Sequence, residues 1–596
     1  MKFQKEKIFF IIFFLISILI GRFTWGLIEL DYQDRGIIGE YSKQNYNSFN
    51  DILRYLVFLS LPSLIFIISK YYSNKNFFNQ ILSFFNTHTE YERKKNIELN
   101  LFFFTFIFIL LASFFSINFL TNIIDSYHEG QRISSAYKNF LDNSLWSGSY
   151  VTVGIFYETL SSSIFWKLFD HISIGITRFA DLIYVLIFKL LAVYFIYLLT
   201  KFTNLNLYKQ IIFFLFNSIV FVSMINYEIG NVSSISFREI PIILLLIFFT
   251  FIISKRNSLL FIFLISCLSP LSMFWGIDRG LICNILIFFI FLFLVLSKRY
   301  QQSFFLLFFI MIVWASSYFF LEKEFEYFIE NTFSIYKEMP YVHGLIHPVP
   351  FSDDPNSSRA TKTMLAILGC IIISINLIFN KDNPTNFSKI FIFLSLISIG
   401  SYLYALGRTD GPHIKNSFGF PLITLSIFFS YFVLKFFKNI SKLKFYISSS
   451  IMIITLIFLS EINFSNIFNF KKRLNLYVNI EDKEFLNKDE KKLIDFLKPK
   501  VKNFDCIQIF SNDAILYYLL QKKSCTKYYF VWSASSKINQ KRFINQMEET
   551  KIIISGGSKN DWDYPLEEKL YLVNSYINEN FNKIDSYKKW NILIRD

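Results

Sequence analysis

Long apolar segments recur along this chain and are separated by short polar ones. Of its 596 residues, 53% are hydrophobic and only 18% are charged, against about 25% charged residues in soluble proteins. A helix of about 20 apolar residues crosses a bilayer. We therefore predict a polytopic α-helical membrane protein with about 13 transmembrane helices. The predicted spans lie near residues 8–28, 53–69, 101–120, 176–200, 207–225, 240–254, 259–275, 281–296, 304–321, 364–379, 390–406, 418–434 and 445–460.

The distribution of basic residues predicts the orientation of these spans. Strict alternation from a cytoplasmic N-terminus places the basic clusters of the short loops inside, as the positive-inside rule requires. The net charge of +15 therefore reflects topology, and we predict no nucleic-acid partner. We expect an integral protein of the bacterial inner (cytoplasmic) membrane, with an uncleaved first helix and an extracytoplasmic C-terminus. The basic clusters are Arg93 to Lys95, Lys255-Arg256, Lys298-Arg299, and Lys435, Lys438, Lys442 and Lys444.

The composition changes after residue 460, which predicts two domains. Residues 1–460 form a transmembrane domain with external loops at 121–175, 322–363 and 407–416. Residues 461–596 form a small soluble extracytoplasmic α/β domain, in which alternating helix and strand patterns favour a largely parallel sheet. "DCIQIF", "KYYFVW", "IIIS" and "WNILIR" are its predicted strands. Cys506 and Cys525 could pair in an oxidising compartment or remain free thiols.

The first cluster of candidate site residues follows the third predicted span directly, in "TNIIDSYHEGQR". On a helix, Asp125, His128, Glu129 and Arg132 would share one face. Asp125 could act as a general base on a hydroxyl group, and the other three could bind substrate. The alternative is a salt-bridge cluster at the membrane interface.

A second acid lies in "VGIFYETLSSSIFWKLFDHIS", where Glu158 and Lys167 disfavour spanning. We predict an amphipathic helix on the outer interface for this segment. Glu158 could bind substrate hydroxyls, or it could simply face solvent. Asp125, Glu129 and Glu158 together could also hold a divalent cation such as Mg²⁺ or Mn²⁺.

Two external turns supply further candidate substrate-binding residues. Asp278 and Arg279 lie between the seventh and eighth spans, where a tight turn needs polar residues in any case. "GRTDGPHIK" follows the eleventh span, and its cationic donors suit a phosphate or pyrophosphate group. Arg408, Asp410, His413 and Lys415 are the candidates in this loop.

The long external loop from Glu322 to Thr363 contains His343 and His347 at helical spacing. Pro348 and Pro350 disfavour a helix that would direct both imidazoles at one metal. A loop that covers the substrate is the better functional interpretation.

The order of these parts resembles the GT-C class of membrane glycosyltransferases, which take sugars from polyprenyl phosphates. An early span followed by "IIDSYHEG", then an interfacial helix, many spans and an extracytoplasmic C-terminal domain carry the resemblance. It implies a hexosyl- or pentosyltransferase with Asp125 as catalytic residue, a polyprenyl-phosphate-linked donor, and a lipid or glycan acceptor of the cell envelope. The first two spans look like an addition, and the adjacent acidic pair of some members is absent. Metal dependence and acceptor class therefore stay open.

Three alternatives remain from the sequence. An O-antigen ligase or polymerase would place its site on the loop from Glu322 to Thr363 and would not need Asp125. A transporter would need ionisable residues along a path to both faces, whereas those of this chain, apart from Lys189, crowd one face. A non-catalytic scaffold that displays the C-terminal domain is the third.

Overall fold

A computed structural model describes residues 2–74, 76–87, 97–224, 235–254, 259–380, 384–437, 441–557 and 564–595. Within these ranges, eleven helices are long and apolar enough to cross a membrane. Two further predicted spans are shorter apolar helices, Ile240–Ser254 and Leu259–Trp275. Each predicted span thus corresponds to a helix, and the polytopic helical fold is confirmed. Of the basic clusters, Arg93 to Lys95, Lys255-Arg256 and Lys438 lie outside the described residues.

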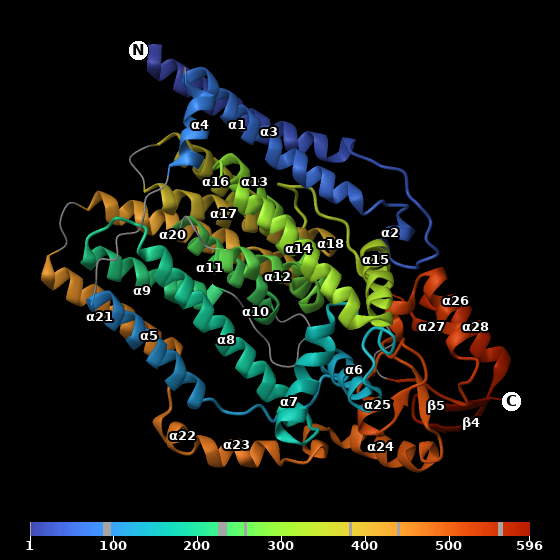
Figure 1. The fold of residues 1–596 in the computed structure, drawn as a ribbon. Coiled ribbons are helices and arrows are strands. Elements are labelled where there is room, and N and C mark those ends of the chain that lie inside the picture. The colour runs from blue at the N-terminus through green and yellow to red at the C-terminus, as the bar shows by residue number, and fades with distance from the viewer. Residues whose placement is uncertain are drawn as a thin grey trace.

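The helices of the transmembrane part form one bundle, with the α1–α3 hairpin packed along one side of it (Figure 1). Their bounds are α1 Lys2–Phe23, η1 Thr24–Leu27, α2 Glu40–Lys43, α3 Phe49–Ser73, α4 Phe77–Asn86, α5 Ile97–Phe115, α6 His128–Asp142, η2 Phe156–Leu160, α7 Ser161–Phe169, α8 Ile174–Thr200, α9 Leu207–Met224, α10 Ile235–Arg238, α11 Ile240–Ser254, α12 Leu259–Trp275, α13 Ile277–Leu296, α14 Tyr300–Leu321, α15 Lys323–His343, α16 Ser357–Phe379, α17 Thr385–Ser401, α18 Leu403–Gly407, α19 Gly411–Ser417, α20 Gly419–Phe436 and α21 Lys442–Leu459.

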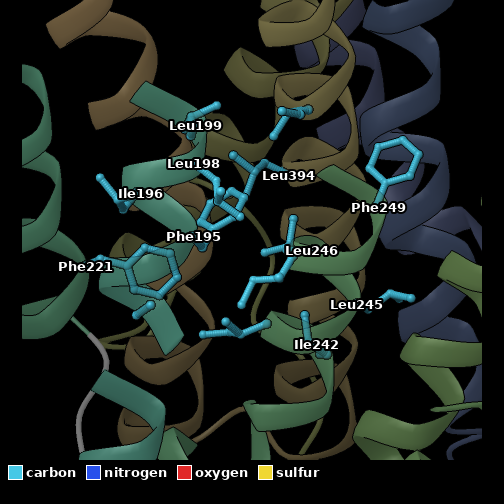
Figure 2. Packing of buried hydrophobic residues seen from close by; sticks show 14 of the residues in the cluster. Phe195, Ile196, Leu198, Leu199, Phe221, Ile242, Leu245, Leu246, Phe249 and Leu394 are labelled. Carbon is cyan, nitrogen blue, oxygen red and sulfur yellow. The ribbon is translucent and has the colours of Figure 1, made fainter. Parts of the chain in front are cut away.

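Large apolar side chains from helices far apart in sequence fill the centre of this bundle. Phe195 of α8, Leu246 and Phe249 of α11 and Leu394 of α17 are buried together (Figure 2). Between transmembrane helices, packing contacts and not the exclusion of water hold such a core together. The bundle core therefore carries long-range contacts between helices.

The segment predicted as an interfacial amphipathic helix is shorter than expected. It consists of the π-helical turn η2 followed by α7. Glu158 and Trp166 are buried, while Leu168 is exposed. The segment does not span, and one of its faces packs inside the protein.

The C-terminal part lies at one end of the bundle (Figure 1). Its five-stranded sheet has the order β2-β1-β3-β5-β4. β1 pairs in parallel with β2 and β3, whereas β3–β5 and β5–β4 are antiparallel. The sheet is thus mixed and not largely parallel. The elements are α22 Phe464–Phe468, α23 Phe470–Val478, η3 Asp482–Phe485, α24 Lys488–Val501, β1 Cys506–Phe510, α25 Leu516–Leu519, β2 Lys523–Ser524, η4 Val531–Ala534, α26 Lys537–Gln546, β3 Ile552–Gly556, α27 Leu566–Lys569, α28 Tyr571–Asn580, β4 Phe581–Tyr587 and β5 Trp590–Arg595.

The prediction of a strand at "KYYFVW" is wrong, because contacts with the transmembrane part decide the conformation of this segment. Its aromatic residues suit a strand by propensity, but the chain here runs irregularly and ends in the 3₁₀ turn η4. The Tyr529 hydroxyl donates to Glu158 of the transmembrane part at 2.8 Å. This segment therefore faces the membrane domain instead of adding to the sheet.

The two cysteines of the C-terminal part form a disulfide between Cys506 and Cys525. The bond joins the start of β1 to the residue that follows β2. This settles the question that the sequence left open.

Candidate active site

A cavity of about 800 Å³ lies at the predicted outer ends of the spans, beneath the C-terminal part. Its wall combines apolar side chains with an excess of cations. The lining includes Ile52, Tyr127, His128, Gln131, Arg238, Ile277, Asp278, Arg279, Met339, His343, Arg359, Tyr404, Leu406, Arg408, Asp410, His413, Lys415, Phe530 and Trp532. Six predicted site residues thus meet here with His128: Asp278, Arg279, Arg408, Asp410, His413 and Lys415.

Asp125 and His128 form a tight turn at the start of α6. Asp125 Oδ1 accepts the backbone N–H groups of Tyr127 at 2.9 Å and His128 at 3.1 Å. Its Oδ2 atom lies 2.7 Å from His128 Nδ1. Burial alone would raise the pKa of Asp125, but the hydrogen bonds and charge of His128 and the Tyr127 N–H group lower it well below its usual value. The carboxylate is therefore ionised and oriented.

Glu129 and Arg132 point away from the cavity into ion pairs with α8. The Arg178 Nε and Nη2 atoms donate to the two Glu129 carboxylate oxygens at 2.7 and 2.8 Å. Arg132 donates to Asp181 at 2.8 Å and lies over the ring of Tyr157. Both residues are buried. They hold α6 against α8, which corresponds to the salt-bridge interpretation of the sequence.

Glu158 is fully buried and also lies outside the cavity wall. Its carboxylate accepts hydrogen bonds from the Thr152 and Val153 N–H groups and from the Tyr529 hydroxyl. Burial raises the pKa of Glu158 despite these donors. The residue therefore joins the C-terminal part to the segment before α7.

The three carboxylates proposed for a metal do not form a ligand set. Asp125 is bound to His128, Glu129 to Arg178, and Glu158 to backbone donors and Tyr529. Among the described residues, no group of three or more His, Cys, Asp or Glu side chains is arranged to hold a metal ion. These three residues therefore do not fit the divalent cation that the sequence left possible.

Asp410 and His413 repeat the geometry of the first turn at the start of α19. Asp410 Oδ1 accepts the His413 N–H at 2.9 Å and lies 2.5 Å from His413 Nδ1. Its Oδ2 accepts from Arg408 Nε at 2.7 Å. Burial opposes ionisation, but His413 and Arg408 lower the pKa of Asp410 to about 2. One carboxylate thus holds two cation-forming groups at the cavity wall.

A second charged cluster faces this turn across Tyr404. Asp278 pairs with Arg238 at 2.6 Å and with Arg279 at 2.7 Å, and Arg279 also pairs with Glu239 at 2.6 Å. Both guanidinium groups lie over the Tyr404 ring, at 5.3 and 4.8 Å from its centroid. The imidazole of His413 also stacks on the Tyr404 ring, with the two ring centroids 4.7 Å apart. Cations and aromatic rings therefore form one continuous wall.

Sequence reasoning did not select Arg238 and Arg359 as site residues. Each lies at the predicted outer end of a span, in "SFREIP" and "NSSRAT". An Arg at an outer helix end departs from the positive-inside rule, and that departure was the signal available. No sequence signal indicated that Phe530 and Trp532 of the C-terminal part would complete the wall.

His343 also lines the cavity, as the last residue of α15. Its ring packs edge-on against Trp532 at 5.5 Å, and its Nδ1 lies 2.6 Å from the Met339 carbonyl. Burial, with the charge of Arg408, lowers its pKa to about 3. His343 is therefore a neutral imidazole near neutral pH, whereas His347 lies apart against Trp25 and Tyr402.

This arrangement suits a substrate that is anionic at one point and apolar elsewhere. Arg279 and Arg238 are balanced by acids, and Arg408 by Asp410. Arg359 and Lys415 add positive charge to the wall beyond these pairs. Partly desolvated guanidinium and ammonium groups bind phosphate strongly, and the oriented Asp125–His128 pair can accept a proton.

No family model matches the chain, and no curated protein sequence matches it significantly. Among solved structures, ArnT from Cupriavidus metallidurans bound to undecaprenyl phosphate is similar, with 8% identity and a TM-score of 0.45 over 84% of this chain and 98% of that one. The oligosaccharyltransferase of Archaeoglobus fulgidus, tethered to an acceptor peptide, has 11% identity and a TM-score of 0.43 over 82% of this chain and 72% of that one. Similarity at this level carries no argument about mechanism, which rests below on this chain's own residues.

Proposed function

We propose that this protein is a membrane glycosyltransferase that moves a sugar from a polyprenyl-phosphate donor to a hydroxyl of a cell-envelope acceptor at the outer face of the membrane. One observation carries the proposal. A cavity at the predicted outer helix ends combines phosphate-suited cations, apolar walls and His128, which is oriented by Asp125.

The donor would place its phosphate against the cationic wall. The departing polyprenyl phosphate gains negative charge as the bond to the sugar breaks. Arg408, Lys415 and Arg359 would stabilise that charge, because preorganised cations in a water-poor site act strongly on developing charge. The apolar lining, including Ile52 and Leu406, suits the first carbons of the lipid.

The acceptor hydroxyl would lose its proton at the other side of the cavity. Asp125 is essential to that step, as the resemblance implies, and His128 is the member of the pair on the cavity wall. Attack on the anomeric carbon opposite the leaving phosphate would invert its configuration. Each step assigned here is carried by side chains of this chain.

The C-terminal part would act in the same site and not as a separate module. Phe530 and Trp532 contribute to the wall, and flat aromatic faces suit the apolar face of a sugar ring. We therefore assign sugar binding partly to these two residues.

The test is transfer by the purified full-length protein in liposomes supplied with radiolabelled polyprenyl-phosphate sugars and a lipid extract as acceptor. The expected result is release of polyprenyl phosphate together with a labelled acceptor. Asp125→Asn should lower the rate at least 10³-fold, within the usual 10²–10⁴-fold contribution of acid–base catalysis.

The matched control is Asp142→Asn, at the other end of the same helix. Asp142 forms an exposed pair with Lys523 at 3.0 Å, and such pairs contribute little to stability. This variant should keep full activity. Full activity of Asp125→Asn would contradict the proposal. The absence of sugar transfer from every polyprenyl donor would contradict it as well.

An O-antigen ligase or polymerase remains the second candidate, and one observation favours it. His343 and Arg359 of the predicted external loop both line the cavity. A ligase would lose activity on substitution of Arg359 or Arg408 and keep it in Asp125→Asn. The same assay with a polyprenyl-diphosphate-linked glycan donor separates the two enzymes.

A further inference from the structure

The Asp125–His128 pair is held in one protonation arrangement by its hydrogen bonds. An ionised carboxylate only accepts hydrogen bonds, so the 2.7 Å contact requires that His128 Nδ1 carries the hydrogen. In a neutral imidazole, the remaining nitrogen, Nε2, then has the lone pair. The contact with Asp125 thereby makes Nε2 the basic atom of the ring.

The two members of the pair differ in their position relative to the cavity. His128 and its neighbour Tyr127 lie on the cavity wall, whereas Asp125 does not contribute to it. The carboxylate faces its own turn, where Oδ1 receives two backbone N–H groups and Oδ2 receives His128. A substrate in the cavity therefore meets the imidazole first.

The surroundings keep the turn in place. Asp125 N–H donates to Glu129, which is itself fixed by Arg178. The Ser126 hydroxyl donates to Asp513 of the C-terminal part at 2.6 Å. These contacts orient the carboxylate, and its exposed part, 40% of the side chain, lies outside the residues that line the cavity.

We infer that His128, through Nε2, is the general base of the proposed sugar transfer and that Asp125 is its positioning residue. The inference rests on the proposed function and assigns the proton-accepting atom within it. The acceptor O–H proton passes to Nε2 while the hydroxyl oxygen bonds to the anomeric carbon. The bond from that carbon to the phosphate oxygen breaks, and its electron pair leaves with polyprenyl phosphate. The imidazolium formed is stabilised by Asp125, as in the Ser-His-Asp arrangement.

The kinetic test compares His128→Ala and His128→Gln with the wild type in the liposome assay. We expect kcat to fall at least 10²-fold in both with KM changed less than threefold, provided that their melting temperatures match the wild type. Added imidazole should restore part of the activity of His128→Ala and none of that of Asp125→Asn. His413→Ala, from the second turn of the same design, is the matched control that imidazole should not rescue.

The opposite kinetic result would identify Asp125 as the base. If His128→Gln kept activity within tenfold while Asp125→Asn lost 10³-fold, the carboxylate would take the proton directly. Loss in His128→Ala without any rescue and with unchanged activity in His128→Gln would show that the imidazole only packs.

A second measurement does not require sugar transfer. Diethyl pyrocarbonate reacts with unprotonated imidazole nitrogen, and mass spectrometry gives the rate at each histidine of the full-length protein. In the wild type, His128 should react, and Asp125→Asn should slow it about tenfold because the amide would donate to Nδ1 and leave hydrogen on Nε2. Unchanged reactivity in that variant, or no reaction at His128 while His413 reacts, would overturn the inference. If instead the wild type shows this pattern but transfers no sugar, the proposed function fails while the basic Nε2 stands.

Discussion

The two Asp-x-x-His turns of this protein share one local design but have different surroundings. In each, the aspartate accepts the backbone N–H of the histidine three residues later and binds its Nδ1 atom. The turn at Asp125 is locked to a buried ion pair and to the C-terminal part, whereas the turn at Asp410 holds the cation Arg408. We therefore propose that the same motif supplies a rigid proton acceptor at one site and part of an anion-binding surface at the other.

The glycines near the two turns also differ in what surrounds them. A Cβ atom on Gly130 would lie 2.6 Å from the backbone nitrogen of Ile515, whereas one on Gly411 would lie 2.4 Å from Nη1 of Arg359. Backbone cannot yield without moving the C-terminal part, but the end of an arginine can. One turn is therefore fixed by close packing, and the other borders an adjustable side chain.

The largest expected effect comes from breaking the ion pair behind the first turn. Arg178→Met would leave Glu129 buried and unpaired, which costs about 3–5 kcal/mol. Thermal unfolding in detergent should show this loss. Lys523→Met, which removes the exposed pair with Asp142, is the control and should change the midpoint of thermal unfolding little. Equal stability of the two variants would show that the first turn is not anchored as described.

The next effect separates the two glycines. Gly130→Ala should destabilise the protein by about 1–3 kcal/mol, the usual cost of overpacking. Gly411→Ala should leave the melting temperature nearly unchanged and alter donor affinity by displacing Arg359. Melting curves and KM values of the two variants measure this difference, and a reversed order would contradict it.

A smaller effect is expected from Asp410→Asn. Loss of this carboxylate frees Arg408 and His413 from their fixed geometry, so donor KM should rise about tenfold with kcat nearly unchanged, as when uniform binding is lost. Asp125→Asn should show the converse, a loss in kcat. If both variants changed the same kinetic parameter, the division of roles between the turns would be wrong.

The smallest effect on stability is expected when the pH is lowered. The pKa of Asp410 in the folded protein is lowered to about 2, from about 3.9 in the unfolded chain. Its contribution to stability is therefore complete above pH 4 and is lost as the pH falls toward 2. Between pH 7 and 5, the wild type and Asp410→Asn should lose stability in parallel, and only below pH 4 should the curves converge. Convergence already at pH 5 would contradict the strength of this pairing.

Much of the fold could be predicted because it follows from local composition. Apolar runs of about 20 residues form helices in a membrane, since a helix satisfies all backbone polar groups within one continuous segment. The strands at Cys506–Phe510 and Ile552–Gly556 were predicted for a similar reason, from short apolar runs between polar ones. The strand Phe581–Tyr587 was missed because its exposed polar residues give no such pattern.

In the candidate site, too, some features follow from local sequence and others from the packing of distant segments. The sequence by itself determined which ionisable residues stand at the predicted outer helix ends, because span length and flanking charge are one-dimensional properties. Only the tertiary structure decided that Glu129 and Arg132 turn to Arg178 and Asp181, that Glu158 meets Tyr529, and that Arg238 and Arg359 join the cavity. The physical reason is that a charged group in a poorly hydrated place takes the nearest partner, and the packing of distant helices sets which partner is near.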